Sequence, residues 1–159
     1  MLMGLTKSSV GRSAVDSGLI IKKHSPDDKV IALAGNPNVG KSTVFNALTG
    51  LNQHTGNWPG KTVSNAQGYC KTESRGLMLV DIPGTYSLMA HSAEEEVARN
   101  FICFGKPDAV AVVCDATSLE RNLNLVLQIA EISKRTVVCV NLMDEAKRKG
   151  IKIDLKRLS

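Results

Sequence analysis

The chain has 159 residues, a formal net charge of +5, and 43% hydrophobic and 22% charged residues. This composition is ordinary for a single globular domain with a buried core, and it excludes a chain that is mostly disordered. The four cysteines have neither disulfide-like nor zinc-like spacing, which favours a reducing, cytoplasmic compartment. The positive excess lies in residues 1–29 and 145–159, which predicts solvated flanks and no nucleic-acid partner.

Residues 1–29 are predicted to form a flexible leader, because glycine, serine and charged residues dominate them. No apolar segment typical of a signal peptide follows Met1. No run of about 18 apolar residues occurs either, so no membrane-spanning helix is expected. The sequence therefore predicts a chain that is soluble by itself, with one domain over residues 30–159.

From residue 30 onward, short apolar runs alternate with helical patterns. Buried strands are expected at residues 30–34, 77–80, 109–114 and 136–140, and an edge strand at 66–72. Helices are expected at residues 41–49, 92–104 and 119–133, and a loop at 51–65. Ser92 is the expected N-cap of the second helix. This alternation predicts an α/β fold with a mostly parallel sheet and helices on both faces.

A phosphate-binding motif follows the first expected strand. Residues 35–42 read GNPNVGKS and fit the P-loop pattern G-x-x-x-x-G-K-S/T. Backbone N–H groups of such a loop bind phosphate oxygens, and the following helix adds its positive end. Lys41 is expected to reach the β- and γ-phosphates, and Ser42 to bind Mg²⁺. The nucleotide-binding residues predicted here are Gly35, Asn36, Pro37, Asn38, Val39, Gly40, Lys41, Ser42 and Thr43.

Two further polar segments each follow an expected strand, where ligands of such sheets bind. Asp81 begins the sequence DIPG and is expected to hold Mg²⁺, while Gly84 is expected to give a backbone N–H to the γ-phosphate. Asn141 and Asp144 belong to the sequence NLMD, in which the carboxylate can accept hydrogen bonds from guanine N1–H and the N2 amine. Helix capping by Asp144 is the alternative interpretation. Leu142 stands where G proteins usually have lysine.

Residues 56–62 read GNWPGKT and contain the single tryptophan. Two glycines and a proline favour a loop. A threonine here can complete the Mg²⁺ shell and contact the γ-phosphate; we favour Thr62, and Thr55 is the alternative. The residues of this segment predicted to contact the nucleotide or its cations are Asn57, Trp58, Pro59, Gly60 and Thr62.

In chain order, the P-loop, G-N-W-P-G-x-T, D-I-P-G and N-x-x-D resemble the G domain of the FeoB-type ferrous iron transport proteins. The similarity runs from about residue 30 to the C-terminus. Residues 56–62 are its most specific part, because general G proteins do not share them. The resemblance implies a Ras-like P-loop GTPase that binds GTP or GDP with Mg²⁺. It also accounts for Leu142, because members of this family can lack the lysine that G proteins usually have at this position.

The family relationship also implies partners and a location. In the full-length protein, a helical domain and a transmembrane domain that moves Fe²⁺ would follow in cis, with the G domain at the cytoplasmic face of the bacterial inner membrane. The fifth guanine-binding motif is not found in the sequence, so the G domain is expected to lack its last strand and helix. No His, Asp, Glu or Cys cluster has ligand spacing, so no direct iron site is expected on this chain.

Slow hydrolysis is expected, because Thr85 occupies the position of the water-orienting glutamine of Ras-like proteins and is too short. The resemblance implies K⁺ near the phosphates, bound by Asn38 and by backbone carbonyls around Asn57 and Trp58. The predicted catalytic residues are Lys41, Asn38, Thr62 and Gly84, and the predicted Mg²⁺ ligands are Ser42, Thr62 and Asp81.

Two other functions fit parts of the pattern. A soluble Era-like GTPase acting on RNA or ribosomes shares the P-loop, D-x-P-G and N-x-x-D, but it usually keeps the lysine and lacks residues 57–60 of this sequence. A nucleotide-binding regulatory module with negligible turnover is the other alternative, and Thr85 favours it.

Overall fold

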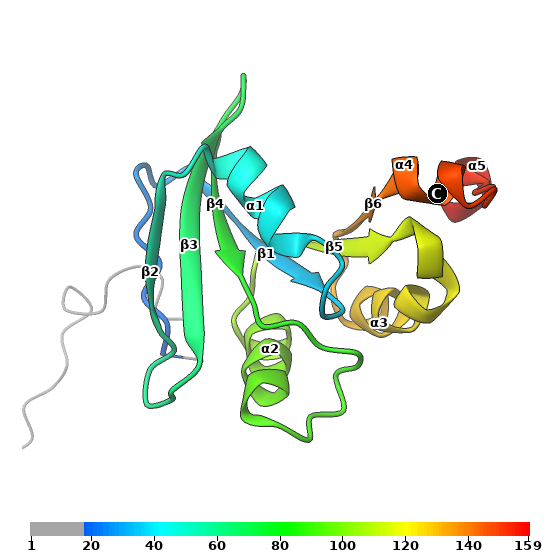
Figure 1. Cartoon of the computed structure of the whole chain (residues 1–159). Coiled ribbons are helices and arrows are strands. Elements are labelled where there is room, and N and C mark those ends of the chain that lie inside the picture. The colour runs from blue at the N-terminus through cyan, green and yellow to red at the C-terminus, as the bar shows by residue number, and fades with distance from the viewer. Residues whose placement is uncertain (1–17) are drawn as a thin grey trace, which may run out of the picture.

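The computed structural model describes residues 18–159 and shows a six-stranded sheet with helices on both faces (Figure 1). The strands are β1 (Lys29–Gly35), β2 (Gln53–Asn57), β3 (Ser64–Lys71), β4 (Gly76–Asp81), β5 (Ala109–Asp115) and β6 (Thr136–Asn141). The helices are α1 (Lys41–Thr49), α2 (Ala93–Phe104), α3 (Leu119–Ile132), α4 (Met143–Arg148) and α5 (Leu155–Leu158), with a 3₁₀ turn η1 (Ala116–Ser118).

The strand order is β2-β3-β4-β1-β5-β6. Strands β4, β1, β5 and β6 run parallel, and β2 and β3 are antiparallel to their neighbours. The predicted α/β class with a mostly parallel sheet is therefore confirmed. This order also brings the carboxyl ends of β1, β4, β5 and β6 to one edge of the sheet, where the polar motifs begin.

Local sequence explains where the helices start and stop. Gly40 precedes α1 with φ of 80° and Gly50 follows it with φ of 57°, left-handed values that favour glycine. Ser92 caps α2 as expected, because its hydroxyl oxygen accepts a hydrogen bond from the Glu95 N–H at 3.1 Å.

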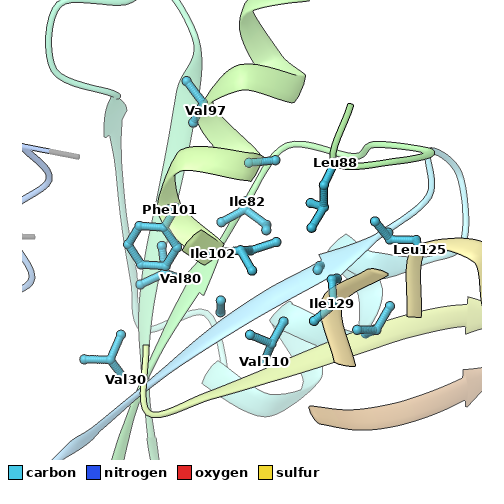
Figure 2. Close-up of a cluster of buried hydrophobic side chains, with 14 of the residues drawn as sticks. Val30, Val80, Ile82, Leu88, Val97, Phe101, Ile102, Val110, Leu125 and Ile129 are labelled. Carbon is cyan, nitrogen blue, oxygen red and sulfur yellow. The ribbon is translucent and has the colours of Figure 1, made fainter. Parts of the chain in front are cut away.

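Each face of the sheet has its own apolar cluster. On the α1 face, Phe45 packs with Leu33 and Leu79. On the opposite face, α2 and α3 direct apolar side chains onto the strands, as Figure 2 shows for Phe101 and Ile129. This two-sided burial is the reason that the central strands read as continuous apolar runs in the sequence.

Two strand expectations need correction. Residues 53–57 form the edge strand β2, although the sequence predicts a loop, and β3 therefore lies inside the sheet instead of at its edge. In the described part of the chain β6 is the other edge strand and is not buried on both faces, since Val137 is 59% exposed. Strand β2 lacks an apolar pattern because its side chains are mostly exposed and it pairs through its backbone.

The expected leader of residues 1–29 is described only from residue 18. Leu19 and Ile21 are 4% and 5% exposed and join the core cluster on the α2 side of the sheet. Asp28 is buried, and its carboxylate accepts hydrogen bonds from the backbone N–H groups of His24 and Ser25. Residues 18–28 are thus packed on the domain, while residues 1–17 lie outside the described part. No helix within residues 18–159 is long and apolar enough to cross a bilayer.

Candidate functional site

Backbone and side-chain contacts join the three polar motifs at one edge of the sheet. The Thr85 N–H, next to the DIPG segment, donates to the Gly35 carbonyl at 3.1 Å. The side-chain amide of Asn141, the last residue of β6, donates to the Val39 carbonyl at 3.0 Å. The P-loop is therefore held on one side by the segment after β4 and on the other by the last residue of β6.

The backbone of the P-loop is left-handed at two positions. Asn38 and Gly40 have φ of 64° and 80°, so both lie in the left-handed region, which asparagine tolerates and glycine prefers. A Cβ on Gly40 would also collide with the side-chain amide of Asn141. Gly35 lies against the carbonyl of Val113, which a Cβ would approach to 2.8 Å. These contacts explain why positions 35 and 40 both hold glycine.

Lys41 and Asp81 form an ion pair at the centre of the site, with side chains only 12% and 21% exposed. They line a cavity of about 350 Å³ together with Thr55 and Thr62. The cavity thus gathers one cation, the two carboxylates of Asp81 and Glu94, and hydroxyl groups, a set suited to a phosphate and a Mg²⁺ ion. Ser42 and Thr43, the next residues of α1, are exposed in its first turn.

The DIPG segment passes close to the P-loop. A Cβ on Gly84 would lie 3.2 Å from both Cα and N of Pro37, so only glycine fits here without displacing the loop. Thr85 is 1% exposed, and its hydroxyl donates to the Ser87 carbonyl at 2.6 Å. This side chain is directed into its own loop, where it cannot orient a water molecule.

The segment GNWPGKT divides into a buried anchor and an exposed part. Trp58 is 3% exposed and packs edge-on against Phe101 of α2, with ring centroids 5.3 Å apart. Its side chain is therefore part of the core, which the sequence did not reveal. Asn57, Pro59 and Gly60 are exposed and do not line the cavity.

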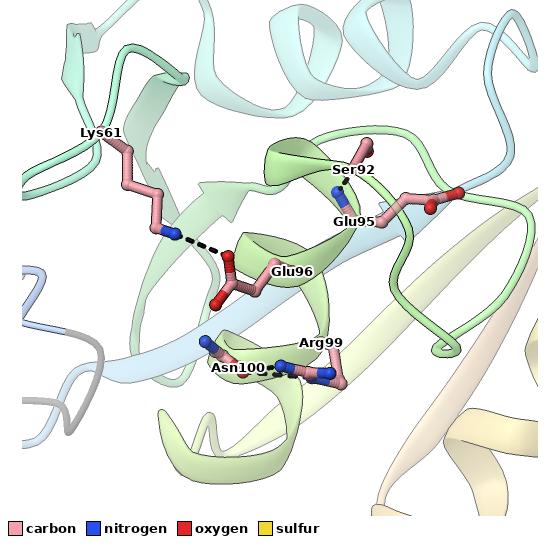
Figure 3. A network of polar contacts seen from close by, with 6 residues as sticks. All are labelled: Lys61, Ser92, Glu95, Glu96, Arg99 and Asn100. Atoms are coloured by element: carbon pink, nitrogen blue, oxygen red, sulfur yellow. Dashed lines mark hydrogen bonds and ion pairs between the residues drawn. The ribbon is translucent and has the colours of Figure 1, made fainter.

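Thr62 and Thr55 are both exposed and both line the cavity with Lys41 and Asp81. The alternatives for the threonine therefore stay open at this point. Beside Thr62, the Nζ of Lys61 lies 2.6 Å from the Glu96 carboxylate on α2, as the dashed line in Figure 3 shows. Hydrogen bonding and charge attraction from Lys61 lower the pKa of the Glu96 carboxyl.

At the end of β6, Leu142 has φ of 60° and occupies the N-cap position of α4. The alternative interpretation of Asp144 as the helix cap is therefore wrong, because Asp144 lies in the first turn of the helix. Its side chain is 81% exposed and makes only a long contact of 3.5 Å with Arg148. Its carboxylate is thus accessible to a ligand at the strand edge. Within residues 18–159, no group of three or more His, Cys, Asp or Glu residues could hold a metal ion.

Comparison with known proteins gives a family match over most of the chain. The family described as Ferrous iron transport protein B matches residues 29–159. The Fe(2+) transporter FeoB of Methanocaldococcus jannaschii is 55% identical over 102 residues, which are 64% of this chain and 15% of that protein. The FeoB of Escherichia coli K12 is 44% identical over 133 residues, 81% of this chain and 17% of that protein. The chain thus spans less than a fifth of the length of these relatives.

Solved structures give the same match. The G domain of T. maritima FeoB superposes with a TM-score of 0.77 and 42% identity, over 82% of this chain and 79% of that one. The cytosolic domain of the same protein matches in its GDP form II and in its GMPPNP form, each with a TM-score of 0.79 and 43% identity. These two matches cover 82% of this chain and 51% and 52% of the others.

Proposed function

The chain belongs to the ferrous iron transport protein B (FeoB) family, and from this premise we propose that it is the GTP-binding and slowly GTP-hydrolysing switch domain of a membrane ferrous iron transporter. The observation that carries the proposal is the meeting of Lys41, Asp81 and Asn141 at one edge of a sheet of the P-loop GTPase fold. The family assignment decides against the Era-like alternative. GDP and GMPPNP forms of a relative support a guanine nucleotide as the ligand.

Each motif has a distinct role in this proposal. Backbone N–H groups of residues 35–43 bind the phosphates, and Lys41 neutralises the charge between the β- and γ-phosphates. The Gly84 backbone N–H donates to the γ-phosphate. Asn141 holds the P-loop through the Val39 carbonyl, while Asp144 accepts the two guanine donors.

Mg²⁺ fits the oxygen donors at this site, since Thr62 and Asp81 line the cavity and Ser42 follows Lys41 in the first turn of α1. Ser42, Thr62 and Asp81 would hold it, and the ion would supply positive charge to the β- and γ-phosphates. Asp81 is paired with Lys41 in this structure, so its carboxylate would hold the ion once the Lys41 ammonium turns to the phosphates. Thr62 would add a contact that exists only when a γ-phosphate is present.

The two threonines of the cavity can be separated by substitution. We expect Thr62→Ala to weaken binding of Mg-GMPPNP about 10-fold, the loss of one contact to a charged group, and to leave Mg-GDP binding unchanged. Thr55→Ala is the matched control, since it removes the same hydroxyl from β2. Titration calorimetry of the three proteins measures both affinities. A larger loss in Thr55→Ala would assign the role to Thr55.

Turnover tests whether the domain hydrolyses GTP or only binds it. Thr85 is buried and bonded within its own loop, so we expect slow release of phosphate. Asn38 is exposed on the P-loop with φ of 64°. We propose that it binds K⁺ together with carbonyls near Asn57 and Trp58. The K⁺ ion would supply the positive charge that an arginine finger supplies in other GTPases.

Phosphate release from GTP should therefore rise in K⁺ relative to Na⁺ buffer by at least about 10-fold. The Asn38→Ala variant should lose this rise and keep its GDP affinity. A rate that is near zero in both salts would instead support the regulatory module with negligible turnover.

The activity of the whole protein is also a proposal. Helical and transmembrane domains are the expected partners in cis, and the domain would lie on the cytosolic side of the cell membrane, as the description of the T. maritima relative as a cytosolic domain suggests. No direct contact of this chain with Fe²⁺ is proposed. Calorimetry with Fe²⁺ tests this point, and a tight site of one ion per chain would contradict it.

A further inference from the structure

The residues before β1 lie against the turn that carries Thr62. We name residues 18–28 the N-terminal arm and residues 58–63 the Trp58 turn. A Cβ on Gly18 would lie 3.5 Å from Cβ of Pro59, so the start of the arm passes beside the turn. The arm precedes residues 29–159, which match the family.

The inward side chains of the arm and of the turn share one apolar cluster. Leu19 and Ile21 are 4% and 5% exposed, whereas Ile20 between them is 73% exposed. Trp58 and Val63 belong to the same cluster and are 3% and 6% exposed. The alternation along the arm is that of a half-buried strand, and its inner face belongs to the same cluster as the two anchors of the turn.

The arm is also fixed along its length by contacts to β3. The Ile20 carbonyl accepts a hydrogen bond from Gln67 Nε2 at 3.1 Å. Farther along, the ring of His24 stacks on Tyr69 with a centroid distance of 4.1 Å. These contacts hold the arm beside the sheet in a defined register.

The geometry of the turn links this packing to the nucleotide site. The Trp58 N–H donates to the Val63 carbonyl at 2.8 Å, which closes the turn. With Trp58 and Val63 pointing into the core, Thr62 between them is exposed and lines the cavity of Lys41 and Asp81. The direction of Thr62 thus depends on the burial of its two anchors.

Burial of Trp58 needs support from several sides. Its indole Nε1 is buried without a hydrogen-bond partner among the described residues, which costs free energy. Apolar packing must offset that cost, and it comes from Phe101 of α2 and from the cluster that contains Leu19 and Ile21. Loss of the arm would therefore weaken the position of the turn.

We propose that Leu19 and Ile21 are positioning residues of the nucleotide site: the N-terminal arm holds the Trp58 turn so that Thr62 faces the γ-phosphate and Mg²⁺. The inference rests on the role proposed above for Thr62. A role of the arm in positioning Thr62 affects the two nucleotides differently. Binding of a nucleotide with a γ-phosphate depends on the arm, whereas binding of GDP, which Thr62 does not contact, is independent of it.

The test compares three variants of the full 159-residue chain by titration calorimetry with Mg-GMPPNP and Mg-GDP. Leu19→Ala should weaken Mg-GMPPNP on the order of 10-fold and leave Mg-GDP unchanged. Ile20→Ala is the matched control, because its side chain points to solvent, and both affinities should stay those of the wild type. Ile21→Val removes a single methylene, so it keeps the fold and should show a smaller effect in the same direction.

Trp58 provides a second readout that needs no nucleotide. It is the only tryptophan of the chain, so quenching of its fluorescence by acrylamide should increase in Leu19→Ala and not in Ile20→Ala. Equal losses of GMPPNP and GDP affinity in Leu19→Ala, or no change in either, would overturn the proposal. If Leu19→Ala fails to fold, the ratio of the two affinities in Ile21→Val decides. Failure of the wild type to bind either nucleotide would instead refute the proposed function.

Discussion

Lys41→Ala should lower the affinity for GTP and GDP by about 100-fold, because the variant loses the charge-assisted hydrogen bonds of the ammonium group to two phosphates. Lys41 begins α1 and is only 12% exposed, so its ammonium group is partly desolvated where it would meet the phosphates. The desolvation strengthens its interaction with charge. Alanine keeps the helix and removes the cation.

Thermal unfolding with and without saturating GDP measures the effect, because a ligand that binds only the folded state raises the melting temperature. At the same GDP concentration the melting temperature of Lys41→Ala should rise much less than that of the wild type. Lys29→Ala is the control: its Nζ pairs with Asp108 at 3.5 Å at the opposite end of β1. An unchanged GDP-induced shift in Lys41→Ala would contradict the assignment of the P-loop.

The second large effect is a change of base specificity in Asp144→Asn. A carboxylate accepts both guanine donors, whereas an asparagine amide meets the N2 amine with its own donor. We expect GTP affinity to fall on the order of 100-fold, because the N2 amine loses its acceptor and the N1–H loses the negative charge of its acceptor. Xanthine carries a carbonyl in place of the N2 amine, so the affinity for xanthosine triphosphate should rise.

Competition between the two nucleotides for the site measures this change directly. Glu145→Gln is the matched control on the same helix, since Glu145 pairs with Lys149 at 2.8 Å and has no proposed contact with the base. If Asp144→Asn keeps the preference for GTP, Asp144 is not the residue that recognises the guanine base.

The central strands and the P-loop could be predicted because their signals are local. A continuous apolar run such as residues 30–34 indicates burial on both faces, and GNPNVGKS follows it directly. Parallel pairing then determines which edge of the sheet carries the polar residues. The positions of Lys41, Asp81 and Asn141 at one edge follow from this logic, and the structure brings them together.

The features that escaped prediction depend on partners far away in the sequence. Strand β2 has a polar sequence and exists through backbone pairing with β3. Burial of Trp58 requires Phe101, and burial of Leu19 requires the same cluster. No local pattern records such partners, so the sequence predicts a loop where residues 53–57 form a strand, and it places Leu19, Ile20 and Ile21 in a leader.

The measurement that tests the central claim most directly is a titration of this chain with GDP and, in parallel, with ADP, both in Mg²⁺ buffer. The claim is that the edge formed by β1, β4 and β6 is a guanine nucleotide site. It predicts one GDP bound per chain and binding of ADP that is weaker by about 100-fold, because adenine lacks the donor pair for Asp144. Equal binding of the two nucleotides would contradict the role of Asp144, and binding of neither would contradict the site as a whole.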